Sequence, residues 1–142
     1  MSAQPEQTPP PPPLPNITAL EEPYFAGLRE GRLMLQRCGK CGHVWFPPSP
    51  LCPECLDTEP VWEEMSGRGT VWSHIVMHQP YFAAFRHELP YNVVFVQLEE
   101  GPYMISRIVD MPNDAIECGM KVQSVFREVT DGVVLPYFTA AG

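Results

Sequence analysis

Cys38-Gly-Lys-Cys41 and Cys52-Pro-Glu-Cys55 are the two stretches that decide the fold of this chain, and ten residues separate them. Each Cys-x-x-Cys turn can direct two thiolates at one point. Two such turns facing each other supply the tetrahedral four-sulfur set that Zn²⁺ prefers. Four protein ligands leave no open position for water or substrate, so the spacing predicts a structural rather than a catalytic zinc site. The predicted ligands are Cys38, Cys41, Cys52 and Cys55.

A disulfide framework is the competing interpretation of these cysteines. The chain shows no secretory signal pattern and no apolar run long enough to span a bilayer, and paired short spacings favour metal. We therefore expect a reducing, cytoplasmic compartment. His43 follows the first turn and could be a ligand, but four cysteines already complete the shell. Cys118, the fifth cysteine, has no neighbouring motif that marks it as an activated nucleophile.

The overall charge disfavours free nucleic acid as the main partner. The 142 residues carry a formal net charge of −8, from 9 Lys and Arg against 17 Asp and Glu. Affinity for phosphate backbones comes chiefly from clustered cations. Four cations nevertheless lie within twelve positions beside the first cysteine pair, and they could hold a small phosphorylated ligand or simply be solvated. These are Arg29, Arg32, Arg37 and Lys40.

The chain divides into three predicted segments: a proline-rich tail (1–16), a helix with a zinc ribbon (17–65) and a second domain (66–142). The tail contains Pro9 to Pro13 without interruption, a composition that favours extended polyproline II and cannot build a core. Disorder, a strap along a partner and a ligand for a proline-binding domain all remain open for it.

Residues 17–32 have the pattern of a short helix. Thr18 and Glu21 have capping-box spacing, Pro23 suits a first turn, and Gly31 can end the helix in a left-handed conformation. One face of this helix is apolar and would pack either on its own chain or on another subunit. That face consists of Tyr24, Phe25 and Leu28.

Short strands at 33–37, 43–47 and 61–64 flank the two cysteine pairs, and together they predict a rubredoxin-like zinc ribbon. Trp45 and Phe46 are large apolar residues on a unit too small to bury many of them. We expect them either to wall the metal or to face a partner.

Beyond Ser66 the pattern changes to period-two strands with turn signals between them. Strands are expected within 67–77, 91–98 and 103–109, followed by a connection with one helical turn near 113–116. A final hairpin at 122–129 and 133–138 encloses Thr130-Asp-Gly132, a favoured tight turn. The fold class is therefore mainly β, with an N-terminal helix and rubredoxin-like zinc ribbon followed by a five-stranded OB-fold barrel.

The loop between the first two of these strands, residues 78–90, is unusually long and aromatic. Tyr81, Phe82 and Phe85 must cover the barrel, line a pocket or enter a partner, and Arg86 lies beside them. His74 and His78 share one face of the preceding strand, but two histidines without a carboxylate are weak evidence for a metal site. The sequence shows no complete catalytic constellation.

Several short motifs together resemble one known family. They are Tyr24-Phe-Ala-Gly-Leu-Arg-Glu-Gly-Arg-Leu-Met-Leu-Gln-Arg-Cys38, Phe46-Pro-Pro, Gly67-Arg-Gly-Thr-Val71, Leu89-Pro-Tyr91, Leu98-Glu-Glu-Gly101, Gly119-Met-Lys-Val122 and Leu135-Pro-Tyr-Phe138. Over about residues 20–140 the chain resembles the DUF35 family, acyl-CoA-associated proteins with a rubredoxin-like zinc ribbon and an OB-fold.

The resemblance implies a small partner of a thiolase-fold enzyme, in which the partner carries the catalytic Cys and His. The chain would then be a non-catalytic subunit acting with acyl-CoA thioesters, docked on the thiolase-fold protein and helping to form the entrance for coenzyme A. From charge and placement we expect coenzyme A contacts at Arg29, Arg32, Arg37, Lys40 and Arg86. Contacts with the partner or the acyl group are expected at Tyr24, Phe25, Trp45, Phe46, Tyr81, Phe82 and Phe85.

Two other functions remain open. Zinc ribbons and OB-folds both commonly bind nucleic acid, and aromatic residues for stacking are available. A stand-alone acyl-CoA carrier or enzyme would use Cys118 as its nucleophile. Which acyl group is involved stays undetermined, because its pocket would lie largely in the partner.

Overall fold

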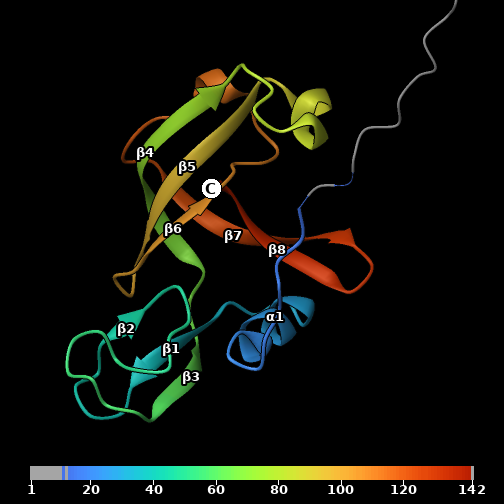
Figure 1. The fold of residues 1–142 in the computed structure, drawn as a ribbon. Coiled ribbons are helices and arrows are strands. Elements are labelled where there is room, and N and C mark those ends of the chain that lie inside the picture. The colour runs from blue at the N-terminus through green and yellow to red at the C-terminus, as the bar shows by residue number, and fades with distance from the viewer. Residues whose placement is uncertain (1–10, 12, 142) are drawn as a thin grey trace, which may run out of the picture.

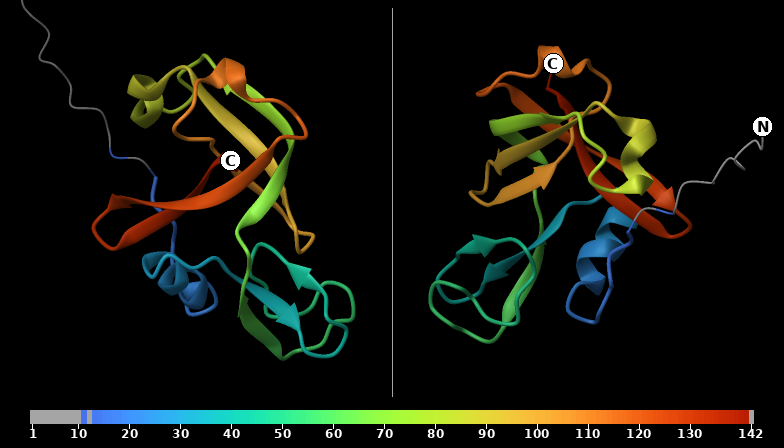
Figure 2. Two further views of the ribbon diagram at one scale, coloured as in Figure 1. Left: turned by 180° about the vertical axis from the view of Figure 1, so that it is seen from behind. Right: turned by 45° about the horizontal axis from the view of Figure 1, so that its top comes forward.

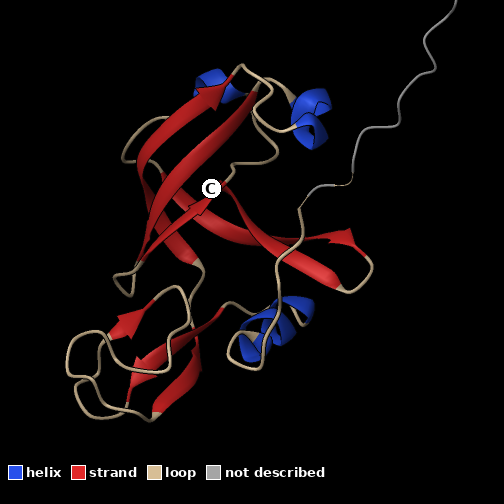
Figure 3. Cartoon of the chain, viewed as in Figure 1, coloured by secondary structure: helices blue, strands red, loops and turns tan. Residues whose placement is uncertain are grey.

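The computed structural model describes residue 11 and residues 13–141, so most of the predicted proline-rich tail lies outside the described residues. The described chain begins with an extended segment and the helix α1 (Glu22–Arg29), continues into a three-stranded zinc-ribbon sheet, and ends in a five-stranded barrel (Figure 1). Strands dominate, as Figure 3 shows, and the predicted fold class is confirmed.

The helix α1 is shorter than the predicted span of 17–32 because a turn occupies each flank. Ahead of it, the Thr18 backbone N–H donates to the Glu21 carboxylate at 2.9 Å, which is half of the expected capping box. Behind it, Gly31 has φ +74°, its N–H donates to Leu28, and the Arg32 N–H donates to Gly27 at 2.8 Å. This pair of bonds is a Schellman motif, which ends a helix abruptly.

The ribbon sheet has the order β2-β1-β3, all antiparallel: β1 is Met34–Cys38, β2 is Val44–Trp45 and β3 is Pro60–Glu64. Helix α1 packs directly on β1, because a Cβ on Gly27 would lie only 2.4 Å from Met34 Cγ. The strand β1, which carries the first metal ligand, is therefore paired with β2 and β3 and also packed against α1.

The barrel contains β4 (Arg68–Met77), β5 (Tyr91–Leu98), β6 (Tyr103–Ser106), β7 (Lys121–Thr130) and β8 (Val133–Ala140), in the order β6-β5-β4-β7-β8. A parallel bridge between Ile108 and Phe138 brings the two edges together, so the barrel is nearly closed. Two 3₁₀ helices, η1 (Ala83–Glu88) and η2 (Asn113–Ala115), lie in the connections. This strand order with its closing bridge is the expected OB-type arrangement.

A buried amide holds the barrel seam. Asn92 is 5% exposed; its side chain donates to the Ile108 carbonyl at 2.9 Å and accepts from the Ile108 N–H at 2.7 Å. It also donates to the Asn113 side chain at 3.0 Å. Each bond satisfies a polar group inside the fold, where leaving it unpaired would cost about 1–3 kcal/mol.

One hydrophobic core runs through helix, ribbon and barrel. Tyr24, Phe25 and Leu28 of α1 belong to the same buried cluster as Leu35 of β1 and Phe138 of β8. Figure 2 shows α1 close to the β7–β8 hairpin, which explains how one short helix reaches both parts. The apolar face of α1 thus packs on its own chain.

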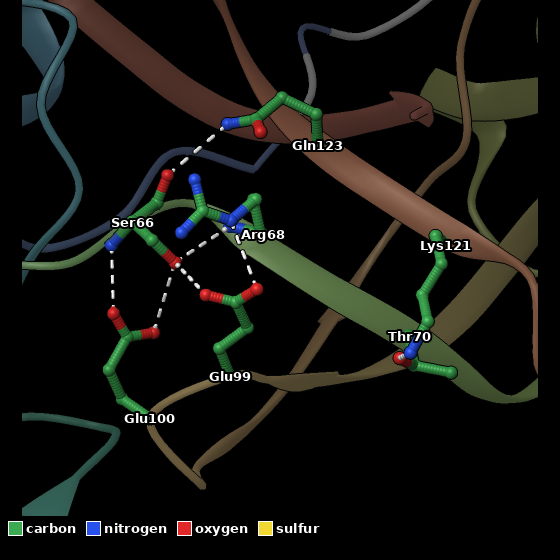
Figure 4. Close-up of polar contacts among 7 residues, drawn as sticks. All are labelled: Ser66, Arg68, Thr70, Glu99, Glu100, Lys121 and Gln123. Atoms are coloured by element: carbon green, nitrogen blue, oxygen red, sulfur yellow. Dashed lines mark hydrogen bonds and ion pairs between the residues drawn. The ribbon is translucent and has the colours of Figure 1, made fainter. Parts of the chain in front are cut away.

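Ser66 joins the ribbon to the barrel through a polar network (Figure 4). Its backbone N–H donates to the Glu100 carboxylate at 2.8 Å, and its hydroxyl donates to Glu99 at 3.2 Å. Arg68 pairs with Glu99 at 3.0 Å, and the Gln123 side chain donates to the Ser66 carbonyl at 3.3 Å. The β5–β6 turn and β7 are thereby tied to the short link between the two units.

The two glycines around this network are required by close packing. Gly67 has φ +76°, and a Cβ there would lie 2.2 Å from Ser124 Oγ. A Cβ on Gly69 would lie 2.6 Å from Val96 Cγ1 and 2.7 Å from the Gln97 carbonyl oxygen. The Gly-x-Gly entrance to β4 therefore lets the chain lie against β7 and β5.

We expect Gly67→Ala to destabilise the protein more than Gly132→Ala. Gly132 has almost the same φ, +77°, but an added Cβ would meet no atom within 4 Å. Both variants should lose about 1 kcal/mol of unfolding free energy, because alanine is strained in the left-handed backbone region. Gly67→Ala should lose about 1–3 kcal/mol more from the clash. Denaturant unfolding measures the difference, and equal losses would contradict the packing described here.

Candidate functional site

The four predicted cysteines converge on one point. The Sγ atoms of Cys38 and Cys55 lie 3.4 Å apart, those of Cys41 and Cys52 lie 3.6 Å apart, and all four lie within 4.8 Å of one another. A tetrahedral zinc site with bonds of about 2.3 Å has sulfur–sulfur edges of about 3.8 Å. The cysteines are free rather than disulfide-bonded. This donor set fits zinc, as predicted, and leaves no open coordination position.

Backbone N–H groups of the first turn favour the thiolate form. The N–H groups of Lys40 and Cys41 point at Cys38 Sγ, at 3.4 and 3.3 Å. The hydrogen bond from Cys41 is the main reason why the pKa of Cys38 falls to about 6. A thiol with a lowered pKa is available as a metal ligand near neutral pH.

Trp45 walls the metal centre, which is one of the two roles expected for it. It is 6% exposed and forms a small buried cluster with Cys38 and Cys52. His43 stacks on Trp45 with ring centroids 6.1 Å apart, and its Nε2 lies 4.0 Å from Glu54. In the part of the chain that the structure describes, the cysteines alone make up the ligand group, so His43 lies beside the site and outside it.

Most of the predicted phosphate-binding cations are already paired with carboxylates. Arg29 pairs with Glu22 at 2.8 Å, Arg32 with Glu64 at 3.3 Å, and Arg37 with Glu63. Such exposed pairs contribute little to stability but lower the local positive potential. Lys40 and Arg86 are exposed, and neither has an ion-pair partner among the described residues.

The structure does not bring these cations together into one site. Lys40 lies in the turn between β1 and β2, whereas Arg86 lies in η1, and Figure 1 places these elements at opposite ends of the molecule. The arginines of α1 and β1 lie on the ribbon side. A phosphate-binding site would therefore use one group of these cations or the other.

The predicted aromatic contacts separate into buried and exposed groups. Tyr24 and Phe25 pack in the main core of this chain, and Trp45 packs against Cys38 and Cys52. Phe46 and Phe85 are half-buried. Tyr81 and Phe82 are exposed at the tip of the aromatic loop and remain free to meet a partner.

Arg107, which the sequence did not single out, holds that loop on the barrel. Its guanidinium lies 4.1 Å from the centroid of Tyr91 and 5.3 Å from that of Phe85, and it pairs with Glu88 at 3.3 Å. The contact joins the end of β6 to η1. Only the tertiary fold brings these groups together, so a local motif could not have found it.

An apolar outer face on β4, β5 and β6 is a second feature that the sequence did not reveal. Trp72, Phe95 and Tyr103 form an aromatic group, with the Phe95 and Tyr103 rings stacked at 4.9 Å and Trp72 edge-on to both. Ile105 beside them is 70% exposed, and Ile75 on β4 lies opposite Val93 of β5. We call these residues the outer face: Trp72, Ile75, Val93, Phe95, Tyr103 and Ile105.

A groove of about 750 Å³ separates the outer face from the zinc ribbon. Its ribbon wall includes Trp45, Phe46 and Pro53, and its barrel wall includes Phe95 and Tyr103. The groove is thus the place where the metal-supported unit meets the apolar surface of the barrel.

Cys118 lies near a histidine that is distant in sequence. Its Sγ is 3.8 Å from His74 Nδ1, and its side chain is exposed. A nucleophilic site also needs a group that orients the base. No hydrogen bond to His74 Nε2 is present among the described residues, so the pair is an incomplete catalytic arrangement.

These features define a protein with a four-cysteine zinc ribbon and an OB-type barrel. The family described as "ChsH2, rubredoxin-like zinc ribbon domain" matches residues 25–61, and that described as "ChsH2, C-terminal OB-fold domain" matches residues 62–127. A DUF35 domain-containing scaffold protein of Methanothermobacter thermautotrophicus is 41% identical over 103 residues, which cover 69% of this chain and 77% of the relative. The chain therefore belongs to the DUF35 family.

Other similar proteins are named as an aldolase and as a hydratase subunit. A solved structure named "Ltp2-ChsH2(DUF35) aldolase" superposes with a TM-score of 0.82 at 35% identity, covering 91% of this chain and 100% of that chain. A probable enoyl-CoA hydratase alpha subunit of Thermomonospora curvata is 37% identical over 118 residues, or 83% of this chain. The matched region is only 36% of that relative, so this chain spans little more than a third of its length. None of the described helices is long and apolar enough to cross a membrane.

Replacement of a single metal ligand should release the zinc. We expect one zinc per chain in the purified protein, and its loss together with ribbon folding in Cys41→Ser, because three thiolates hold zinc much more weakly than four. Cys118→Ser is the matched control and should keep one zinc. Zinc content measured by mass spectrometry after dialysis against a chelator tests this. Full zinc retention in Cys41→Ser would contradict the assignment.

Proposed function

We propose that this chain is a non-catalytic, zinc-containing subunit of a thiolase-like complex that makes or breaks carbon–carbon bonds in acyl-CoA thioesters. The outer face is the observation that carries the proposal. An antiparallel sheet with one solvated face normally alternates apolar and polar residues. Here most of the outward positions are apolar as well, with Ser73 and Gln97 as the polar exceptions, and such apolar surface marks an interaction site.

The chemistry of the reaction favours a non-catalytic role for this chain. Thiolase-type acyl transfer needs a cysteine nucleophile, a base, and a group that orients the base. Outside the metal set, the described residues offer one thiol, and its histidine has no orienting partner. The zinc site, with four protein ligands, offers no position for substrate. The nucleophile and base are therefore assigned to the thiolase-fold partner.

The names of relatives are consistent with an assembly role. Several are called scaffold proteins or alpha subunits, and one solved relative is part of an aldolase with a second named component. We assign the outer face, together with the exposed loop tip at Tyr81 and Phe82, as the docking surface for the partner. The aromatic side chains and the adjoining groove would then border the acyl-CoA entrance.

A charge on the outer face should abolish docking. We expect Ile75→Asp to prevent co-purification with the co-expressed thiolase-fold partner, because the interface would bury an unpaired carboxylate. Val61→Asp on the ribbon edge is the matched control, since Val61 is 57% exposed and Ile75 55%. Size-exclusion chromatography with light scattering measures the complex. Equal co-purification of both variants would exclude the outer face, and a wild-type chain that never co-purifies would overturn the proposed function.

We assign the coenzyme A phosphates to Lys40 or Arg86, the two candidate cations without a carboxylate partner. If Lys40 or Arg86 contacts the phosphates, its replacement by Gln should raise KM for acyl-CoA several-fold in the complex. It should leave kcat nearly unchanged, because the lost binding is shared by the ground and transition states. Arg127→Gln, which breaks a pair with Asp110, is the control. Unchanged KM in both variants would remove these residues from the site.

Nucleic-acid binding is the second candidate, because bases can stack on aromatic side chains such as those of Trp72, Phe95 and Tyr103. The net charge of −8 and the carboxylates of Glu99 and Glu100 near this sheet oppose it. A salt-dependent affinity for single-stranded oligonucleotides that is lost in Trp72→Ala would favour it over the acyl-CoA complex.

A further inference from the structure

The end of the proline-rich segment borders a second groove. Pro13, Leu14 and Pro15 line a groove of about 790 Å³, and Ile17 just after them packs against the hydrophobic core. Figures 1 and 2 show the segment ahead of α1 passing beside the β7–β8 hairpin. Ile17 therefore anchors the chain where residues 13–15 meet the groove.

The walls of this groove are aromatic and come from parts of the chain that are distant in sequence. Four half-buried rings line it: Phe46, Phe85, Tyr91 and Tyr137. Arg107 also lines it, stacked on Tyr91 and Phe85 and paired with Glu88. Burial raises the pKa of Tyr137, and its hydroxyl can act as a hydrogen-bond donor. Apolar rings with a few donors among them form the usual wall of a polyproline-binding groove.

We propose that this groove is a polyproline-recognition site and that residues 13–15 are its intramolecular ligand. Proline rings pack flat on aromatic side chains, and a proline-rich segment loses little conformational freedom on binding because its backbone is already restricted. Prolyl carbonyls are acceptors without a competing N–H, and Tyr137 and Arg107 offer donors. The segment acts as a strap along the groove, with Pro15 half-buried and Pro13 and Leu14 exposed.

The strap also borders the outer face. Val93 and Ile105 belong both to that face and to the groove, so the two surfaces are continuous. The proposal concerns the groove alone and does not depend on which partner binds the outer face. Failure of the thiolase-fold complex to form would leave it intact.

A full-length variant that removes the strap's chemistry tests the contact. We expect the triple change Pro13→Gly, Leu14→Ser and Pro15→Gly to speed amide hydrogen exchange in η1 at least five-fold, because η1 carries one wall of the groove. The control is Val61→Ser, at an equally exposed apolar residue away from the groove. Exchange in η1 that matches the control would overturn the strap.

A peptide competition tests recognition directly. The peptide Gln4–Pro15, titrated into the triple variant by calorimetry, should bind at least ten-fold more tightly than to the wild-type chain, where the strap acts at high effective concentration. The same peptide with glycine at every proline should not bind. Equal affinity for both chains, or for both peptides, would overturn the proposal. A wild-type dimer that dissociates in the triple variant would also overturn it, because the strap would then occupy a second copy.

Discussion

Coordination of one metal by four thiolates is the interaction on which the rest of this structure depends. The ribbon has one strand of two residues and two of five, and a long segment from Phe46 to Glu59 without strands. So small a unit cannot bury enough apolar surface to hold its shape, and a metal cross-link supplies the difference. Cys38 is also the last residue of β1, so the metal fixes the strand that carries Leu35 into the common core.

From β1 the constraint passes to the barrel through two routes. One is the shared core with α1, and the other is the network of Ser66 with Glu99 and Glu100. The link at Ser66–Gly67 is held in place, because it is hydrogen-bonded to both β7 and the β5–β6 turn. The two grooves therefore have walls from separate units that are held together by the shared core and by these hydrogen bonds.

Local patterns predicted those parts of the fold that depend on local physics. The cysteine spacing indicated the zinc site, the Asp-Gly pair indicated the β7–β8 turn, and Gly31 indicated the end of α1; the structure contains all three. The family resemblance to DUF35 proteins, carried by the same motifs, was confirmed. In these cases the neighbours that decide the conformation are adjacent in sequence.

Features that depend on distant contacts were not predictable from the sequence alone. Arg107 meets Phe85 and Tyr91 only after β6 is placed beside β5, and Cys118 meets His74 across 44 positions. The outer face was also not predicted, because the sequence places Ile75 and Phe95 on strands but does not show which side of each strand faces the barrel interior. Carboxylates from α1 and β3 pair with the arginines that looked like a free basic patch.

The composition of the outer face bears on why chemistry would reside in a partner. Tyr103 is its one titratable residue, and no described carboxylate, histidine or cysteine belongs to it. A surface of this kind, placed over a partner's nucleophile, would exclude water without adding a base or acid that competes for the proton. It would also strengthen the electrostatic interactions in the covered site, because apolar walls lower the local dielectric. Under the proposed function, a metal-supported chain with such a face would assist acyl-CoA chemistry while the reacting groups lie on the partner.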